Sequence, residues 1–166
     1  METLDLVDKQ DTVVGEATRD ECHQHQLRHR AVHIFLFDTN GHILLQQRSK
    51  EKDVYPGFME SSLSGHVLKG ETYERAAIRE LKEELNIELT RDKLRRESKF
   101  EIKYGPEHEF VQVFTATTDK KIKKSTDEIL ETYWITKDEL MHEVTKNQKR
   151  FTPVCLAAIQ CFAGRK

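Results

Sequence analysis

A glycine, an arginine and four glutamates are spaced at fixed intervals in residues 65–87 of this 166-residue chain. The segment reads GHVLKGETYERAAIRELKEELNI, and its pattern is G-x5-E-x7-R-E-U-x-E-E-x-N-U, where U is apolar. Six such positions together match by chance only about once in ten million tries at average residue frequencies. The residues that the pattern fixes are Gly65, Glu71, Arg79, Glu80, Leu81, Glu83, Glu84, Asn86 and Ile87.

The C-terminal half of this segment predicts a helix with carboxylates on one side. At about 100° per residue, Glu80, Glu83 and Glu84 lie together, next to an apolar arc that can face a core. Like charges within one helical turn repel each other. A divalent cation such as Mg²⁺ removes this conflict, because it prefers oxygen ligands and binds through a few carboxylates plus substrate phosphates. The spacing therefore indicates a cation-dependent enzyme acting on diphosphates, and a solvated acidic helix is the alternative.

The pattern resembles the Nudix box, with one departure. Asn86 stands where that family usually has the glycine that ends the helix, and asparagine also tolerates the left-handed backbone needed there. The resemblance implies a Nudix-type α/β/α sandwich with a mixed β-sheet. It also implies that Glu80, Glu83, Glu84 and the backbone carbonyl of Gly65 hold Mg²⁺ or Mn²⁺ ions. Arg79 would then orient a neighbouring glutamate.

The N-terminal half of the chain should position this helix through two hairpins. Residues 4–7 and 12–16 flank a polar turn and read as an N-terminal hairpin, and a helical turn begins at Thr18. Residues 31–37 and 43–47 enclose Asn40-Gly41, a strong hairpin signal, and should lie in the central sheet. Residues 49–57 form a charged loop, and residues 61–64 form a short strand that leads to Gly65.

The C-terminal half adds strands and then two helices. Residues 98–104 and 109–117 read as strands joined by the turn Gly105-Pro106, and residues 131–135 as another strand. Residues 137–144 and 153–162 read as helices, with Pro153 suited to a first helical turn. We expect a single Nudix hydrolase domain over residues 1–166, with its core in residues 29–145.

Composition limits the function classes. A chain that is 37% hydrophobic and 34% charged fits one globular domain, and a net charge of −2 argues against nucleic-acid polymers and membrane surfaces as partners. No apolar run spans a membrane, and the N-terminus lacks the features of a signal peptide. We therefore expect a cytoplasmic protein, a monomer or homodimer, whose partner is a small-molecule diphosphate. Cys22, Cys155 and Cys161 should be free thiols.

The resemblance extends over residues 4–134 to the isopentenyl-diphosphate isomerase branch and its hydrolase relatives. The segments that carry it are VDKQDTVVGEATRDECH, LRHRAVHIFLF and ILLQQRSKEKDVYPGF. In those isomerases, basic residues in the loop before Pro-Gly bind the substrate diphosphate. Arg48 and Lys52 occupy the matching positions, and Arg19 matches a third cation. From the sequence alone, solubility of the loop would explain Arg48 and Lys52 equally well.

The same isomerases carry a metal site of histidines and glutamates. His23, His29 and His66 match three of its ligands, and Glu107 and Glu109 match its acidic pair. Such a set can hold Mn²⁺, Zn²⁺ or Mg²⁺, and several histidines favour the first two. Each histidine taken singly would more commonly be a surface or hydrogen-bonded side chain. The resemblance thus leaves a second metal site as an open alternative.

One substitution argues against isomerase activity. Where the isomerases place a catalytic cysteine, this chain has Leu63 or Ser64, and an unactivated serine is a poor acid. The chain also keeps the box residues that the isomerases have partly lost. We therefore expect a metal-dependent hydrolase of a nucleoside diphosphate derivative or another X-diphosphate. An isopentenyl-diphosphate delta-isomerase and a non-catalytic Nudix module are the alternatives.

The expected reaction is attack of water on a diphosphate phosphorus. The resemblance favours Glu83 as the base that takes the proton, with Glu80 and Glu109 as alternatives. The group beyond the diphosphate would be contacted by aromatic side chains, any of which could also be core residues. The candidates are Phe35, Tyr55, Phe58, Phe100, Tyr104 and Phe110.

Overall fold

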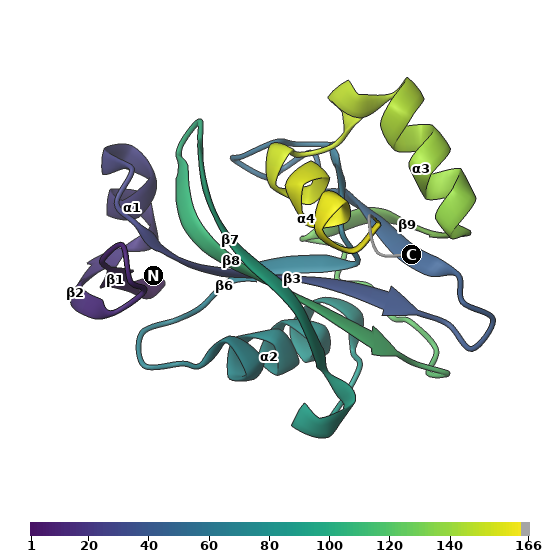
Figure 1. The fold of residues 1–166 in the computed structure, drawn as a ribbon, viewed down its shortest axis with the longest axis horizontal. Helices are drawn as coiled ribbons and strands as arrows, with labels where there is room; N and C mark the ends of the chain where they lie inside the picture. The colour runs from purple at the N-terminus through teal and green to yellow at the C-terminus, as the bar shows by residue number, and fades with distance from the viewer. Residues whose placement is uncertain (164–166) are drawn as a thin grey trace.

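The computed structural model describes residues 1–163, and a mixed β-sheet forms its centre (Figure 1). The strand order is β5-β4-β3-β8-β7, with β6 paired to β3 and β9 paired to β4. Strands β3 and β8 are parallel, and the other neighbours are antiparallel. The strands are β3 (His29–Phe37), β4 (Ile43–Arg48), β5 (Met59–Glu60), β6 (Leu63–His66), β7 (Arg95–Tyr104), β8 (Glu107–Thr117) and β9 (Ile129–Ile135).

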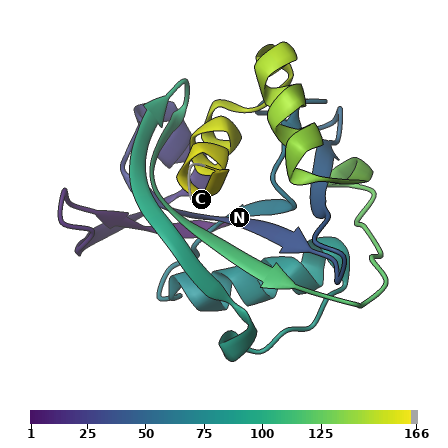
Figure 2. The ribbon, with the colours of Figure 1, turned by 45° about the vertical axis from the view of Figure 1, so that its right-hand side comes forward.

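Helices cover both faces of this sheet, as Figures 1 and 2 show. Helix α2 (Tyr73–Leu85) lies on one face, and α3 (Lys137–Lys146) and α4 (Pro153–Ala163) lie on the other. Two short 3₁₀ helices, Arg91–Lys93 and Gln148–Arg150, join elements. This arrangement confirms the predicted α/β/α sandwich with a mixed sheet.

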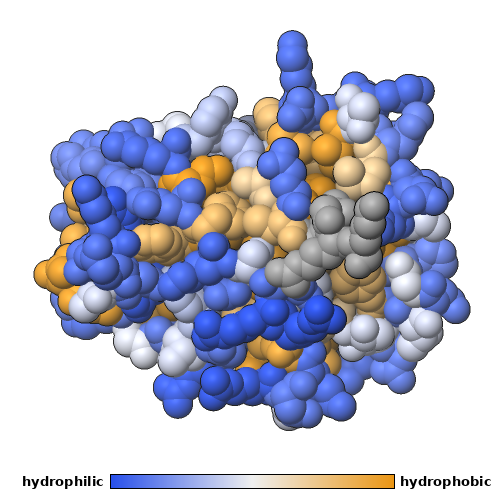
Figure 3. All heavy atoms as spheres, in the orientation of Figure 1, coloured by the Kyte–Doolittle hydropathy of each residue, from blue (hydrophilic) through white to orange (hydrophobic). Residues whose placement is uncertain are grey.

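Strand β3 is buried on both faces because each face meets helices. Val32, Ile34 and Leu36 belong to the apolar cluster that includes α2. Ala31 and Phe35 belong to a second cluster, which includes residues of α3 and α4. Alternate residues of one strand therefore supply two separate cores. Figure 3 shows one face of the molecule, with hydrophilic residues around its edge and hydrophobic residues across its middle. None of the described helices is long and apolar enough to cross a membrane.

The predicted N-terminal hairpin is confirmed as a separate two-stranded sheet. Strand β1 (Thr3–Val7) pairs with β2 (Val13–Thr18), and α1 (Arg19–His25) follows directly. Thr18 caps α1, since its hydroxyl accepts from the Glu21 backbone while the Glu21 carboxylate accepts from the Thr18 backbone. This reciprocal capping box fixes where α1 begins. All three cysteines are free thiols, as expected.

The second predicted hairpin forms, but its two strands separate almost at once. Strands β3 and β4 pair only at Phe37 and Ile43. Beyond that pair, β3 takes β6 and β8 as neighbours, whereas β4 takes β5 and β9. The Asn40-Gly41 signal specified the turn, but partners from distant parts of the chain determined the pairing. Side chains from both faces of the sheet can approach each other where the strands diverge.

Local capping sets the bounds of α2. The Thr72 hydroxyl accepts a hydrogen bond from the Arg75 backbone N–H, which begins the helix. Asn86 has a φ of 54° and donates its backbone N–H to the carbonyls of Leu81 and Lys82. The interpretation of Asn86 as a left-handed helix end is therefore confirmed. Within the predicted apolar arc, Ala77, Leu81 and Leu85 are buried, while Ile78 is only partly covered.

Asp11 joins the N-terminal hairpin to the main sheet and to α2. Its Oδ1 lies 2.6 Å from Arg30 Nε, and its Oδ2 accepts from Tyr73 Oη at 2.9 Å and Lys99 Nζ at 2.8 Å. Burial disfavours the charged form, but the bonds from Lys99, Arg30 and Tyr73 outweigh it and lower the pKa of Asp11. The ionised carboxylate therefore stabilises the folded state.

We predict that Asp11→Asn lowers the free energy of unfolding by about 1–3 kcal/mol at pH 7, as expected for lost hydrogen bonds to a charged group. Asparagine tolerates the φ of 62° at this position, so the backbone should not change. Because the pKa is lowered on folding, the contribution is complete above the ordinary value of 3.8 and is lost as the pH falls through the folded-state pKa. Urea unfolding at several pH values tests this. A difference in the free energy of unfolding between the wild type and Asp11→Asn that persists at low pH would contradict this prediction.

Candidate active site

One cavity of about 280 Å³ gathers most of the residues that the sequence singled out. It lies where β3, β6, β8, α1, α2 and the loop of residues 49–57 meet. Arg79 and His29 are not part of its lining and lie behind residues that are. The predicted site residues that line the cavity are Arg19, His23, Arg48, Lys52, Gly65, His66, Glu80, Glu83, Glu84, Glu107 and Glu109.

Helix α2 presents its three carboxylates unequally. Glu80 and Glu84 are buried, whereas the Glu83 side chain is 59% exposed. All three carboxylates line the cavity, and the rotation of α2 against the sheet leaves Glu83 more exposed than the other two. Glu84 reaches the opposite wall, where its Oε2 lies 3.4 Å from Gln46 Nε2 of β4.

Arg79 holds the acidic residues together from behind the cavity. Its Nε and Nη2 each donate to the Glu71 carboxylate at 2.9 Å. Its Nη1 donates to Glu80 at 2.6 Å and to Glu83 at 3.2 Å, and its Nη2 also donates to the His66 carbonyl at 3.0 Å. The guanidinium therefore links the loop glutamate to the helix glutamates, through the forked geometry that arginine provides.

Gly65 is required by close packing. A Cβ atom at this position would lie 2.3 Å from the carboxyl carbon of Glu80. Real Cβ atoms do not approach other atoms so closely, so any other residue would displace the Glu80 carboxylate. The glycine of the sequence pattern thus makes room for the first of the helix glutamates.

Burial raises the pKa values of the two inner carboxylates. Burial lifts the pKa of Glu80 to about 7, against the opposing effect of Arg79, and the negative charge of Glu83 adds to the increase. Burial and the nearby Glu80 raise the pKa of Glu84 well above its ordinary value. Two neighbouring carboxylates repel each other when both are ionised. A hard divalent cation bound between them would remove this repulsion, so the pair is a suitable set of ligands.

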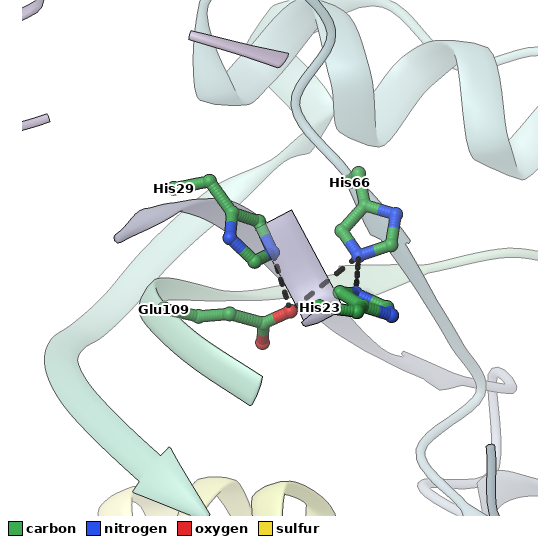
Figure 4. Close-up of side chains that lie close together, drawn as sticks. All are labelled: His23, His29, His66 and Glu109. Carbon is green, nitrogen blue, oxygen red and sulfur yellow. Dashed lines mark hydrogen bonds and ion pairs between the residues drawn. The ribbon is translucent and has the colours of Figure 1, made fainter. Parts of the chain in front are cut away.

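A second cluster, formed by His23, His29, His66 and Glu109, lies at the α1 side of the cavity (Figure 4). One ligand atom from each of these residues lies within 4.8 Å of the others. Glu109 Oε1 is 3.2 Å from His29 Nε2 and 3.5 Å from His66 Nε2. His23 Nε2 is 3.3 Å from His66 Nε2. The four side chains thus come from α1, β3, β6 and β8 and converge on one point.

Neighbouring acceptors orient these imidazoles. His29 Nδ1 lies 2.8 Å from the Leu27 carbonyl, and His66 Nδ1 lies 3.4 Å from Glu2 Oε2. In both rings Nε2 therefore faces Glu109. Burial opposes ionisation of Glu109, but hydrogen bonds from His29 and His66 outweigh it and lower the pKa of this carboxyl. Such outer acceptors are typical of metal-binding histidines.

Glu107 lies apart from the four-residue cluster, although it lines the same cavity. Its Oε2 is buried and has no hydrogen-bond partner among the described residues. Burial and the negative charge of Glu109 raise the pKa of Glu107 to about 8. The structure therefore brings together four of the five residues predicted for the second metal site and leaves the fifth beside them.

The three predicted phosphate-binding cations also reach the cavity, each with a protein partner. Arg19 Nη1 and Nη2 donate to Asp53 at 2.8 and 2.9 Å, and Lys52 forms an ion pair with Glu128. The Arg48 Nε and Nη2 atoms donate to the Val54 carbonyl. Three cationic side chains therefore line the cavity together with its carboxylates.

Several lining residues carry no motif and were missed by sequence reasoning. The examples with charged or polar side chains are Glu2, His33, Glu60, Ser125 and Glu128. Of Leu63 and Ser64, the two candidates for the position of the isomerase cysteine, Ser64 lines the cavity and Leu63 is fully buried. Of the aromatic candidates for the rest of the substrate, Tyr55 lines the cavity, whereas Phe35 is fully buried in the core.

The sequence is similar to those of known proteins over most of its length. The model of the NUDIX domain matches residues 27–155. An isopentenyl-diphosphate Delta-isomerase of Serratia proteamaculans is 34% identical over 91% of this chain and 86% of its own length. An uncharacterized Nudix hydrolase of Pseudomonas aeruginosa is 32% identical over 96% of this chain and 90% of its own.

Solved structures show the same fold. The crystal structure of DR0079 from Deinococcus radiodurans superposes with a TM-score of 0.81 and 28% identity, over 97% of this chain and 99% of that one. Together with the domain match, this shows that the chain is a member of the Nudix family of hydrolases.

Proposed function

We propose that this protein is a divalent-cation-dependent hydrolase that cleaves the diphosphate linkage of a nucleoside diphosphate derivative or another X-diphosphate. The main support is the acidic set Glu80, Glu83 and Glu84, which lines one cavity with Gly65 and with three cationic side chains. A non-catalytic Nudix module would have no need to keep this set complete.

The residues that would hold Mg²⁺ or Mn²⁺ are Glu80, Glu83, Glu84 and the backbone carbonyl of Gly65. The raised pKa values of Glu80 and Glu84 fit such a site, because a bound cation would remove their mutual repulsion. When bound, the cation neutralises charge on the phosphates and lowers the pKa of the attacking water.

The side chains around this set have separate roles in the proposal. Arg19, Arg48 and Lys52 hold the phosphate oxygens, with Arg19 and Lys52 exchanging their present carboxylate partners for substrate. Glu83 accepts the proton of the attacking water, and its exposed position at the rim allows water to reach it. Glu80 and Glu109 are the alternative bases, although Glu109 is already hydrogen-bonded to two histidines.

We also propose that His23, His29, His66 and Glu109 bind a second cation, for which imidazole ligands favour Mn²⁺ or Zn²⁺ over Mg²⁺. We predict two classes of Mn²⁺ site in a calorimetric titration of the wild-type protein. His66→Ala should lose one class and Glu84→Gln the other, while His42→Ala, a change at a histidine outside the cavity, should keep both. Unchanged Mn²⁺ binding by His66→Ala would contradict the second site.

An isomerase acting on isopentenyl diphosphate is the second candidate function. It is favoured by the cluster of histidines and by relatives named as isomerases. It is opposed by Ser64, which stands in the cavity at the position of the catalytic cysteine. Incubation with isopentenyl diphosphate and Mg²⁺ separates the candidates. Released phosphate supports the hydrolase, and dimethylallyl diphosphate supports the isomerase. A protein that converts neither isopentenyl diphosphate nor any other diphosphate would be a non-catalytic module.

A further inference from the structure

His33 is a buried histidine on the wall of the cavity, outside both acidic and histidine clusters. It lies on β3 on the same face as Ala31 and Phe35, and only 3% of its surface is exposed. It lines the cavity together with Ala31 and with Val154 of α4. A polar side chain at such a core position needs partners for both ring nitrogens.

Two acceptors surround Nδ1 of His33. The Ser61 hydroxyl lies 3.1 Å from this nitrogen and donates its one hydrogen to the Leu63 carbonyl at 2.8 Å. Glu60 Oε1 lies 3.4 Å from the same nitrogen. A hydroxyl that has already donated, and a carboxylate, can only accept. Nδ1 of His33 therefore carries the hydrogen.

Neighbouring donors hold Glu60 in this position. Its Oε1 accepts from the Ser61 backbone N–H at 2.9 Å, and its Oε2 accepts from the Thr152 hydroxyl at 2.8 Å. Thr152 in turn accepts from the Cys155 backbone N–H at the start of α4. The orientation of His33 is thus set by a chain of hydrogen bonds that extends from β5 to α4.

This arrangement makes Nε2 of His33 an acceptor. Burial lowers the pKa of His33, so the ring is neutral at pH 7. A neutral imidazole with hydrogen on Nδ1 has a lone pair on Nε2. Among residues 1–163, no hydrogen-bond donor contacts this atom. Nε2 is not among the fully buried polar atoms that lack a partner, so it is open to the cavity that His33 lines, and a donor from a bound molecule would be favoured there.

We propose that His33 Nε2 recognises the organic part of the substrate by accepting a hydrogen bond from an N–H or O–H group on it. The inference rests on the proposed function and narrows its substrate class. An amino group of a base or a hydroxyl of a sugar supplies such a donor, whereas an isoprenyl chain supplies none. His33 is thus a specificity-determining residue, and Glu60 and Ser61 position it.

The test uses pairs of ligands that differ in one donor and cannot be hydrolysed. The α,β-methylene analogues of ADP and of purine riboside diphosphate differ only in a base amino group, and those of ADP and 2′-deoxy-ADP differ only in a sugar hydroxyl. Calorimetry with Mg²⁺ compares the wild type with His33→Asn, whose amide can still donate to Ser61 and Glu60 but offers no acceptor at the Nε2 position. His42→Asn is the matched control at a histidine outside the cavity.

We expect the wild type and His42→Asn to bind the donor-bearing member of at least one pair at least about 10-fold more tightly, a typical gain for a hydrogen bond to a buried group. His33→Asn should lose this preference and still bind methylenediphosphonate as the wild type does. A wild type without preference in either pair, or a folded His33→Asn that keeps it, would overturn the proposal.

Nitrogen-15 spectra of the wild-type imidazoles provide a readout that does not depend on folding of the variant. They should show hydrogen on Nδ1 of His33 and a shift of Nε2 when the preferred analogue binds. Hydrogen on Nε2, or no shift, would overturn the proposal. The analogues are not cleaved, so their binding does not depend on hydrolase activity. A protein that shows the ligand preference but hydrolyses no diphosphate would contradict the proposed function and leave the role of His33 in binding intact.

Discussion

Hydrolysis of a diphosphate substrate should fall about 10²–10⁴-fold when Glu83 is replaced by glutamine, the usual contribution of a general base. Glutamine keeps the size of the side chain and can still accept from Arg79, which contacts Glu83 at 3.2 Å. It cannot take a proton from water. Because the side chain is largely exposed, the fold should be unaffected, and kcat/KM at saturating Mg²⁺ measures the loss.

The matched control is Glu88→Gln, which changes an exposed glutamate just beyond the same helix. Glu88 forms an ion pair with Lys82 and does not line the cavity. Its variant should keep wild-type activity. Glu80→Gln and Glu109→Gln complete the series, because each removes an alternative base. A Glu83→Gln protein as active as the wild type would exclude Glu83 from the proton transfer.

Gly65→Ala should lower kcat/KM by about 10²-fold, because misplacing a catalytic group by about 1 Å has effects of this size. The added methyl group would lie 2.3 Å from the Glu80 carboxyl carbon, so this flexible side chain must move out of its position. The apparent affinity for Mg²⁺ should fall with activity. Stability should change little, since the atoms displaced are at the end of a side chain.

Gly15→Ala is the control for a glycine replaced within a strand. A Cβ at Gly15 would meet only Leu6 Cδ1 at 3.8 Å, an ordinary contact. Steady-state kinetics and a Mg²⁺ titration of both variants separate the effect of displacing Glu80 from the effect of adding a methyl group to a strand glycine. Normal activity and normal Mg²⁺ dependence in Gly65→Ala would show that the position of Glu80 is not important for the reaction.

The parts of the fold that local chemistry determines were predictable from the sequence. Thr18 and Thr72 cap helices, Asn86 ends one, and Asn40-Gly41 makes a turn. The separation of β3 from β4 could not be predicted, because it depends on pairing with β6, β8 and β9, which are distant in the chain. Nor does the sequence reveal which helix carboxylates are buried, since that depends on the rotation of α2 against the sheet.

Some residues of the candidate site were likewise predictable from the sequence, and others were not. Glu80, Glu83 and Glu84 were predicted from their spacing, which binding of a cation constrains. The resemblance to the isomerases predicted His23, His29, His66 and Glu109. The structure brings those four together. His33 and Glu60 gave no signal, because neither belongs to the spaced pattern of residues 65–87 or to the residues that the resemblance matched. Only the meeting of β3, β5 and α4 shows that they adjoin the cavity.

Phosphorus-31 NMR of diphosphate cleavage in water enriched in oxygen-18 tests the central claim most directly. A library of nucleoside diphosphate derivatives and other X-diphosphates would be incubated with Mg²⁺, with Mn²⁺ and with a chelator. We expect cleavage of at least one compound only when a cation is present, with oxygen-18 bonded to phosphorus in a product. Cleavage that continues in chelator, oxygen-18 bonded only to carbon, or no cleavage of any compound would contradict this mechanism.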